Sequence, residues 1–357
     1  MKADFAVIGG GVIGLASAYE LARQGATVTV LERGGVGGES SWAGGGILFP
    51  LLPWDYGEPV TRLTRWSGRL YPEWVVELQA RTGIDPEYRA SGMLVLDAPD
   101  PDGALAWCAA HGEPAERVEV RRVMPDCGPD GQGLWLPAVA QVRNPRLVKA
   151  LARRLELEGV RIVERAEATR IHVAGNRVTG VETPRGTFTA GTYVVAAGAW
   201  SRIVLGELAP TLPIAPVRGQ MLLFKTDPGR LAPIVLRHGV YLIPRGDGHI
   251  LAGSTLEEVG FDKGTTPDVA AWLHAAAAEI FPPLAALRPV RHWAGLRPGS
   301  PGNVPVIARH PSVENLYLNS GHFRYGVTMA PGSARLLGNL LAGGEQPFDV
   351  SPYRWPG

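Results

Sequence analysis

DFAVIGGGVIGLASAYELARQGATVTVLE, residues 4–32, is the stretch of sequence that decides the fold. Residues 4–8 form a short apolar run ending at glycines, which is typical of a buried parallel strand. Apolar residues then recur at helical spacing from Val12 until Gly25, which favours a helix that ends at that glycine. The β-branched run of residues 27–31 predicts a second strand, ending at Glu32. The segment is therefore a strand–helix–strand unit.

The glycines between the first strand and the helix follow the pattern GxGxxG, a dinucleotide-binding motif of Rossmann-type folds. The first glycine allows a tight turn, the second a close approach of the backbone to pyrophosphate, and the third close helix–strand packing. The N–H groups of the helix N-terminus attract phosphate. Glu32 can accept hydrogen bonds from both ribose hydroxyls, whereas it would repel the 2′-phosphate of NADP. The residues predicted to bind the dinucleotide here are Gly9, Gly11, Val12, Ile13, Gly14, Glu32 and Arg33.

Two further small-residue stretches favour FAD over NAD as the dinucleotide. Residues 40–46 (SSWAGGG) would let the backbone approach a flavin ring closely. Residues 192–201 form a strand running into a small-residue turn, which typically returns to the adenosine half of the cofactor. Each stretch alone could be an ordinary glycine-rich loop, but their order along the chain favours a cofactor site. The residues predicted to bind FAD here are Ser40, Ser41, Ala43, Gly44, Gly45, Gly46, Ala168, Ala197, Gly198 and Trp200.

The rest of the chain alternates helical and sheet patterns. Helices are predicted at residues 59–82, with a kink at Pro72, and at 143–157, 269–281 and 332–342, with a short helix near Leu105. A β-meander is predicted at residues 177–189, and a larger antiparallel sheet at 214–255. The fold class is α/β and α+β, a glutathione-reductase-like FAD fold. A Rossmann-type FAD-binding domain (1–82, 143–206, 303–357) carries a discontinuous antiparallel-sheet substrate domain (83–142, 207–302).

Composition limits the classes of function. The 357 residues include 35 basic and 34 acidic side chains, for a net charge of +1, which favours neither nucleic acid nor an anionic membrane as partner. The only cysteines, Cys108 and Cys127, form neither a disulfide framework nor a metal-binding spacing, so we expect a reducing cytoplasm and no metal. No run of eighteen apolar residues predicts a membrane span.

The chain resembles the D-amino acid oxidase superfamily, and within it the bacterial glycine oxidases associated with the thiazole branch of thiamine biosynthesis. The most specific matching segments are WAGLRPG at residues 293–299 and GHFRYG at 321–326. The other matching segments are residues 4–32, 40–46, 142–145, 193–201, 216–220, 241–245 and 252–255.

This resemblance implies a site. Arg297 would bind the substrate carboxylate through two parallel hydrogen bonds, Tyr241 would add its hydroxyl, and Arg324 would lie near both flavin and carboxylate. The residues that would offer backbone to the flavin are His322, Phe323, Arg324, Tyr325, Gly326 and Val327. The implied substrates are dioxygen and glycine, with sarcosine or small D-amino acids, and the implied assembly is a homotetramer. Other readings stay open for the individual side chains: a structural ion pair for Arg297, a packed strand residue for Tyr241, and a packed histidine rather than a base for His322.

Some positions depart from the family pattern. Gly239, preceded by His238, stands where the family carries histidine; Leu256 replaces a pocket methionine, and Tyr325 an asparagine. Some family members hold flavin through a cysteine in the C-terminal half. Both cysteines here precede residue 128, so we expect non-covalent FAD. Two alternative functions remain: a dehydrogenase that passes electrons to a quinone or protein, and a flavin-binding subunit without turnover.

Overall fold

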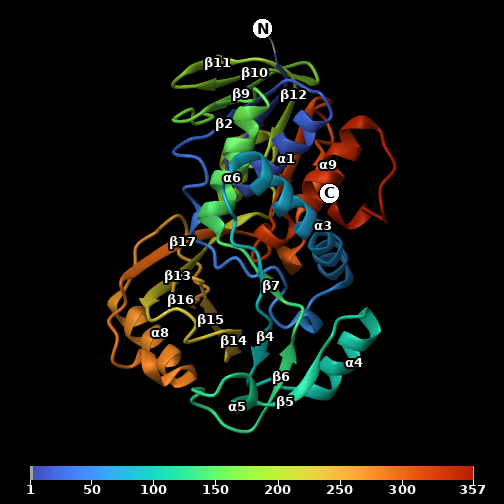
Figure 1. Ribbon diagram of the computed structural model, residues 1–357. Helices are drawn as coiled ribbons and strands as arrows, with labels where there is room; N and C mark the ends of the chain where they lie inside the picture. The colour runs from blue at the N-terminus through green and yellow to red at the C-terminus, as the bar shows by residue number, and fades with distance from the viewer. Residues whose placement is uncertain (1–2, 357) are drawn as a thin grey trace.

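A six-stranded sheet occupies the upper part of the molecule in Figure 1, a computed structural model that describes residues 3–356. Its strands in spatial order are β18 (Val306–Arg309), β19 (Leu316–Ser320), β12 (Ala190–Val195), β1 (Ala3–Ile8), β2 (Val28–Leu31) and β8 (Arg161–Val163). All neighbours are parallel except the β18 edge strand, which is antiparallel to β19. The predicted Rossmann-type sheet is confirmed, with β1 at its centre.

An eight-stranded sheet forms the lower part of the molecule (Figure 1). Its strands in spatial order are β17 (Arg291–Gly299), β13 (Ala215–Lys225), β16 (His249–Gly253), β15 (Val240–Pro244), β14 (Ile234–Arg237), β4 (Met93–Val95), β6 (Gln132–Leu136) and β5 (Glu116–Glu119). The predicted antiparallel pattern holds except between β14 and β4, which run parallel. That parallel contact joins two stretches of chain that are remote in sequence.

Two small sheets complete the β-structure. The meander predicted at residues 177–189 contains β10 (Arg177–Thr183) and β11 (Gly186–Phe188), and β9 (Arg170–Ala174), which was not predicted, adds a third strand to this sheet. A two-stranded sheet joins β3 (Arg89–Ala90) to β7 (Ala140–Gln141). The predicted domain boundaries remain a prediction, although each large sheet takes its strands from separate stretches of the chain.

Four helices share one hydrophobic core with the six-stranded sheet. They are α1 (Val12–Arg23), α3 (Glu58–Thr82), α6 (Asn144–Leu157) and α9 (Gly326–Ala342). Three of them pack against the sheet, and α3 packs on α6 and α9. The remaining helices are α2 (Ser40–Ala43), α4 (Pro101–His111), α5 (Val120–Val123), α7 (Ser201–Leu205) and α8 (Pro267–Ile280). The predicted start of α6 at the Asn-Pro pair is confirmed. Proline suits the first turn of a helix, because the N–H that it lacks would have no partner there anyway.

The last helix corrects the sequence prediction. It begins at Gly326 and not at residue 332, and it contains Pro331 in its interior. Proline has no N–H, so the carbonyl of Val327, four residues earlier, loses its helical partner. The Tyr71 hydroxyl from α3 donates a hydrogen bond to that carbonyl. A contact from another helix therefore replaces the missing bond, and the helix continues through the proline.

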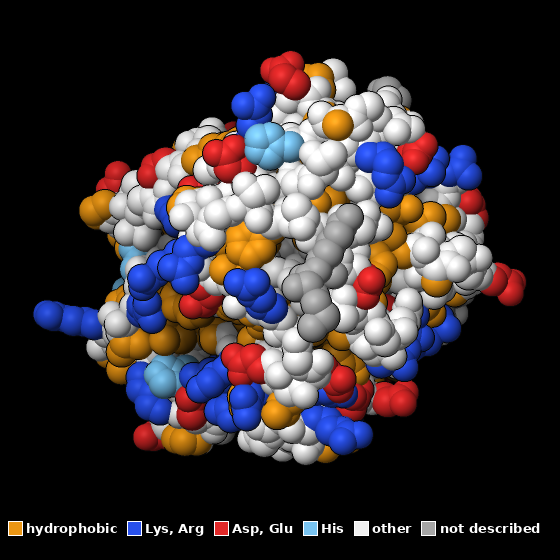
Figure 2. All heavy atoms as spheres, turned by 90° about the horizontal axis from the view of Figure 1, so that it is seen from above, with side chains coloured by type: hydrophobic (Ala, Val, Ile, Leu, Met, Phe, Trp, Pro, Cys, Tyr) orange, Lys and Arg blue, Asp and Glu red, His pale blue; other side chains and the backbone are white. Residues whose placement is uncertain are grey.

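The surface agrees with the balanced composition. On the face shown in Figure 2, basic and acidic side chains are interspersed. Within residues 3–356, no helix combines the length and the apolar character needed to cross a bilayer.

Candidate active site

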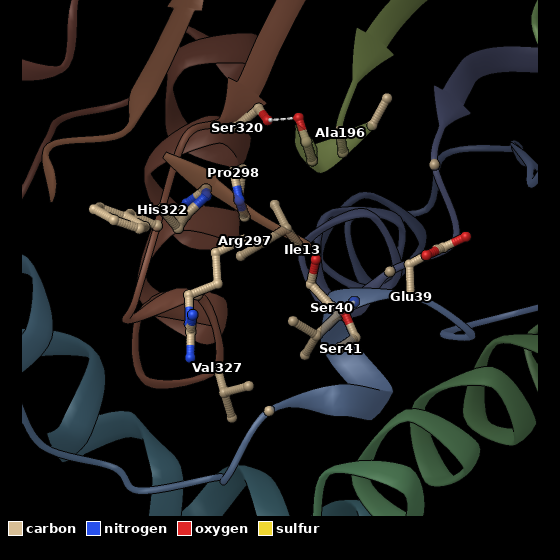
Figure 3. Close-up of a pocket in the computed structure, with 18 of the residues that line it drawn as sticks. Ile13, Glu39, Ser40, Ser41, Ala196, Arg297, Pro298, Ser320, His322 and Val327 are labelled. Carbon is tan, nitrogen blue, oxygen red and sulfur yellow. Dashed lines mark hydrogen bonds between the residues drawn. The ribbon is translucent and has the colours of Figure 1, made fainter. Parts of the chain in front are cut away.

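One long cavity takes its lining from the turns of the six-stranded sheet and from the strands of the eight-stranded sheet. Arg297 of β17 projects into it, and Ile13, Ser40 and Ser41 line it from the other part of the molecule (Figure 3). The predicted site residues that line this cavity are Gly9, Gly11, Val12, Ile13, Glu32, Arg33, Ser40, Ser41, Gly44, Gly45, Gly46, Ala168, Ala197, Gly198, Trp200, Tyr241, Arg297, His322, Phe323, Arg324, Tyr325, Gly326 and Val327. Segments far apart in the sequence thus meet at one site.

Two predicted cofactor residues, Gly14 and Ala43, support the cavity without lining it. A Cβ on Gly14 would lie 1.9 Å from the carbonyl oxygen of Gly9, so only glycine allows the helix to pack this closely on the turn. The carbonyl of Ala43 accepts a hydrogen bond of 3.1 Å from the indole of Trp293. Their part in the site is to hold the two small-residue loops in place.

Glu32 closes the glycine turn from the end of β2. Its buried carboxylate accepts backbone hydrogen bonds from Gly10, at 2.7 Å, and from Gly34, at 2.8 Å. The Ser41 hydroxyl accepts a hydrogen bond from the N–H of Val12, at 2.9 Å, where α1 begins. An anionic carboxylate and a helix N-terminus therefore stand side by side, the pairing that a ribose and its phosphate require.

A cation and an aromatic ring, Arg33 and Trp200, lie against each other in the lining of the cavity. The Arg33 guanidinium lies 3.9 Å from the centre of the Trp200 ring and donates to Glu39 at 2.7 Å. Glu39 also pairs with Lys263, at 3.1 Å, on the segment that follows β16. A planar group and a flat ring in this part of the lining suit a heteroaromatic base.

The segment before α9 forms the opposite wall of the cavity. His322 is fully buried, and burial lowers the pKa of its imidazole to about 3, so the ring is neutral near pH 7. Phe323 adopts a left-handed backbone conformation (φ 44°) that turns the chain into the helix. The side chain of the N-cap residue Tyr325 makes no capping hydrogen bond to α9. The first two residues of α9, Gly326 and Val327, line the cavity. The positive end of a long helix thus faces this part of the site.

Arg297 places a guanidinium at the cavity. Its guanidinium donates to the Thr255 carbonyl at 3.1 Å and to the Ser254 hydroxyl at 2.6 Å. Burial lowers the pKa of Arg297, and the nearby Arg324 lowers it further, whereas Tyr241 raises it. Within residues 3–356, no carboxylate forms an ion pair with Arg297, so a structural ion pair does not explain it.

Tyr241 and Arg324 accompany Arg297. Tyr241 is buried on β15, and its hydroxyl lies 4.0 Å from the sulfur of Met221. Arg324 reaches the Tyr56 hydroxyl at 3.5 Å. The structure therefore brings the three predicted substrate residues to one end of the cavity, where two cations and a hydroxyl converge.

The positions that depart from the family pattern have different surroundings. His238 is largely exposed and lies 3.0 Å from Asp97, away from the cavity, and Leu256 is about half exposed. Tyr325 is buried in the wall and stacks edge-on against Tyr56, with ring centres 5.0 Å apart. Of these departures, Tyr325 is the one that lines the cavity.

Asn144 is a polar residue of the lining that sequence reasoning missed. Asn144, the first residue of α6, is fully buried, and neither atom of its amide has a partner among residues 3–356. The Nε2 atom of His322 is also unpaired within the described chain. Because an unpaired buried polar group costs about 1–3 kcal/mol, these atoms fit a cavity made for a ligand with polar edges, as a flavin has. The sequence predicted a helix start at the Asn-Pro pair and a family match for residues 142–145, but no role for Asn144 in the site.

Other missed residues of the lining are less distinctive in sequence. They are Ile8, Leu31, Glu39, Ile47, Phe49, Leu51, Ala166, Glu167, Ala196, Ile203, Val204, Ser254, Pro298, Asn319 and Ser320. Most belong to apolar runs, where nothing in the sequence separates a cavity wall from a core.

Known proteins share this architecture. The family model described as FAD dependent oxidoreductase (DAO) matches residues 4–340. A glycine oxidase from Pseudomonas putida is 46% identical over 99% of this chain and 98% of its own. A bifunctional ThiO/ThiG protein from Synechocystis is 35% identical over 95% of this chain, which spans 51% of that protein. The crystal structure of glycine oxidase from Geobacillus kaustophilus matches with a TM-score of 0.93 at 27% identity, covering 99% of this chain and 98% of that one. The chain therefore belongs to the DAO family of FAD-dependent oxidoreductases, and within that family to the glycine oxidases.

Proposed function

We propose that this enzyme oxidises glycine with Arg297 as the carboxylate-binding residue, giving glyoxylate, ammonia and hydrogen peroxide from glycine, water and dioxygen. Sarcosine and small D-amino acids are further candidate substrates. The observation that carries the proposal is the guanidinium of Arg297, which lies at the cavity without an ion pair within residues 3–356. A buried cation is stabilised by an anion, and a carboxylate matches its planar fork.

The side chains around Arg297 define what the substrate meets. The Tyr241 hydroxyl is available as a second donor to the carboxylate, and Arg324 adds a further positive charge. These contacts would fix the α-carbon against the flavin, which supplies the hydride acceptor when bound. The neutral His322, with its pKa lowered to about 3, is too weak a base to hold the proton of the substrate ammonium. That proton leaves to solvent, so turnover should rise with pH as the amine becomes neutral.

We also propose that the residues named above bind FAD without a covalent link. Cys108 and Cys127 are both buried and neither lines the cavity, and burial raises the pKa of the Cys108 thiol to about 11. A neutral thiol in a core is a poor nucleophile. Acid denaturation should therefore release the yellow chromophore into the supernatant. A homotetramer in the cytoplasm, serving the thiazole branch of thiamine biosynthesis, completes the proposal that follows from the family.

The test is anaerobic mixing of the purified yellow protein with excess glycine while the absorbance of oxidised flavin is recorded. Bleaching that air reverses, with release of peroxide, is the expected result. Bleaching by sarcosine or a D-amino acid but not by glycine would assign that amino acid as the substrate in place of glycine. Bleaching by glycine with slow reoxidation in air would favour a dehydrogenase, and no bleaching with any amino acid would favour a non-catalytic subunit.

A further inference from the structure

Arg245, which directly follows β15, is a buried cation that contacts the loop of Gly44, Gly45 and Gly46 in the cavity lining. It donates from Nη1 to the Gln141 side-chain oxygen at 2.7 Å and to the Val142 carbonyl at 2.9 Å. Its Nη2 donates to the Gly45 carbonyl at 2.6 Å. Burial lowers the pKa of Arg245 to about 10, which leaves the group charged near neutral pH. Its three hydrogen-bond acceptors are all neutral.

The loop that Arg245 contacts packs closely against neighbouring backbone and is hydrogen-bonded to it. The carbonyl of Gly46 accepts from the N–H of Val142, and the carbonyl of Ala140 accepts from the N–H of Leu48, each at 2.9 Å. A Cβ on Gly45 would stand 2.6 Å from the Ile243 side chain, and one on Gly46 would stand 2.1 Å from the Val142 carbonyl. Contacts with Ile243 and with the backbone of residues 140–142 therefore fix the position of this loop.

The same loop presents free donors at the cavity. Gly45 and Gly46 both line it, and within residues 3–356 their backbone N–H groups have no hydrogen-bond partner. The Gly45 carbonyl and the Gly46 N–H belong to one peptide unit. A cation that hydrogen-bonds the carbonyl polarises this unit and makes its N–H a stronger donor. The charge of Arg245 therefore acts at the cavity without the side chain entering it.

We propose that Arg245 is a positioning residue that tunes the flavin, because it orients and polarises the Gly45–Gly46 peptide at the cavity. The inference rests on the proposed placement of the flavin ring at this loop. A reduced flavin gathers negative charge, and preorganised positive dipoles stabilise that charge. Arg245 therefore favours the reduced form of the cofactor.

The test compares Arg245→Met and Arg245→Lys with the wild type in the flavin-loaded enzyme. The midpoint potential is measured by slow enzymatic reduction against a reference dye, with no amino acid present. Arg245→Met should shift the equilibrium at least tenfold toward oxidised flavin, which is about 30 mV for a two-electron couple. Arg245→Lys should shift it at least threefold in the same direction, because a single ammonium cannot reproduce the fork of a guanidinium.

Arg143→Met is the matched control. Arg143 also carries a positive charge near Arg245, but it pairs with Glu87 and Asp247 and does not touch the Gly45 carbonyl. The equilibrium between oxidised and reduced flavin in Arg143→Met should stay within threefold of that in the wild type. Equilibria for both Arg245 variants within threefold of the wild type would overturn the inference; if Arg245→Met does not fold, Arg245→Lys decides by the same threshold. Because no amino acid is used, a protein that ignores glycine can still support the inference, and one that oxidises glycine can still refute it.

Discussion

Gly219 on β13 leaves the space that the guanidinium of Arg297 occupies: a Cβ at position 219 would stand 2.1 Å from its Nη1 atom. The two residues lie on neighbouring antiparallel strands, near the cross-strand pair of Val217 with Arg297. The absence of a side chain at one position thus sets the placement of the charged group at the other.

Gly219→Ala should weaken substrate binding without unfolding the protein. The atoms that a methyl group would meet are the end of a flexible side chain, which can move, whereas the strand backbone stays in place. We expect the KM for glycine to rise about tenfold or more, since a charge-assisted pair contributes about 1.5–3 kcal/mol. Steady-state kinetics and thermal unfolding measure the two effects. An unchanged KM would show that Arg297 does not need this position.

Substitutions at Arg297 and Tyr241 should differ in size. Arg297→Met removes the proposed carboxylate partner and should lower kcat/KM for glycine at least a hundredfold, about 3 kcal/mol. Tyr241→Phe removes one neutral donor and should lower it about fivefold. The flavin spectrum of each variant is the control for an intact cofactor site. If Arg297→Met keeps its apparent affinity within about threefold, the assignment of the carboxylate site is wrong.

The hydrogen bond from Tyr71 to the Val327 carbonyl should stabilise the fold. Tyr71→Phe leaves that carbonyl unpaired inside α9, and we expect a loss of about 1–2 kcal/mol in the free energy of unfolding. In a Pro331→Ala background the new N–H can bond the carbonyl, so the same substitution should cost less. Urea denaturation of the four proteins gives the coupling. Equal costs in the two backgrounds would contradict the role given to Pro331.

Lowering the pH should destabilise the protein through His322. Its folded pKa of about 3 lies below the value of about 6.5 expected in the unfolded chain, so the unfolded chain binds more protons between these values. Stability therefore falls as pH decreases through this window, by about 1.4 kcal/mol between pH 7.5 and 5.5 from this residue. Burial lowers the pKa of His292 as well, with the same sign.

His322→Gln is the comparison for this pH effect. Denaturation at pH 7.5 and 5.5 should show a smaller difference in the variant than in the wild type, with the His292 share remaining. The same pH difference in both proteins would mean that His322 is not held neutral in the folded state.

The sequence predicted the parts of the fold that depend on local pattern. The strand–helix–strand unit around the glycine turn and the start of α6 were recoverable, because apolar spacing and Asn-Pro chemistry act within a few residues. The start of α9 was not recoverable, since Pro331 is tolerated only because Tyr71 arrives from another helix. The predicted parallel and antiparallel sheets followed from the same local signals, but the β14–β4 pairing joins distant stretches.

Many residues that line the candidate site could be predicted from the sequence, whereas the residues that hold them in position could not. The lining residues that were predicted came from glycine motifs and from the family resemblance, and they meet in one cavity. The roles of Gly219 and Arg245 were hidden, because each acts on a residue of another strand or loop. A single sequence gives no register between remote strands, so such pairs emerge only from the folded structure.

The order in which the chain crosses the two sheets also constrains how the enzyme is made. The residues that line the cavity extend from Ile8, the last residue of β1, to Val327 in α9. Arg297 lies between them in the sequence, just before β18 and β19 complete the six-stranded sheet. A ribosome therefore releases the glycine turn long before its partners exist, and no chain that ends before Val327 contains every residue of the cavity lining. A complete flavin site thus requires synthesis to have reached α9. Splitting the gene between β16 and α8 should yield two fragments, neither of which retains flavin alone.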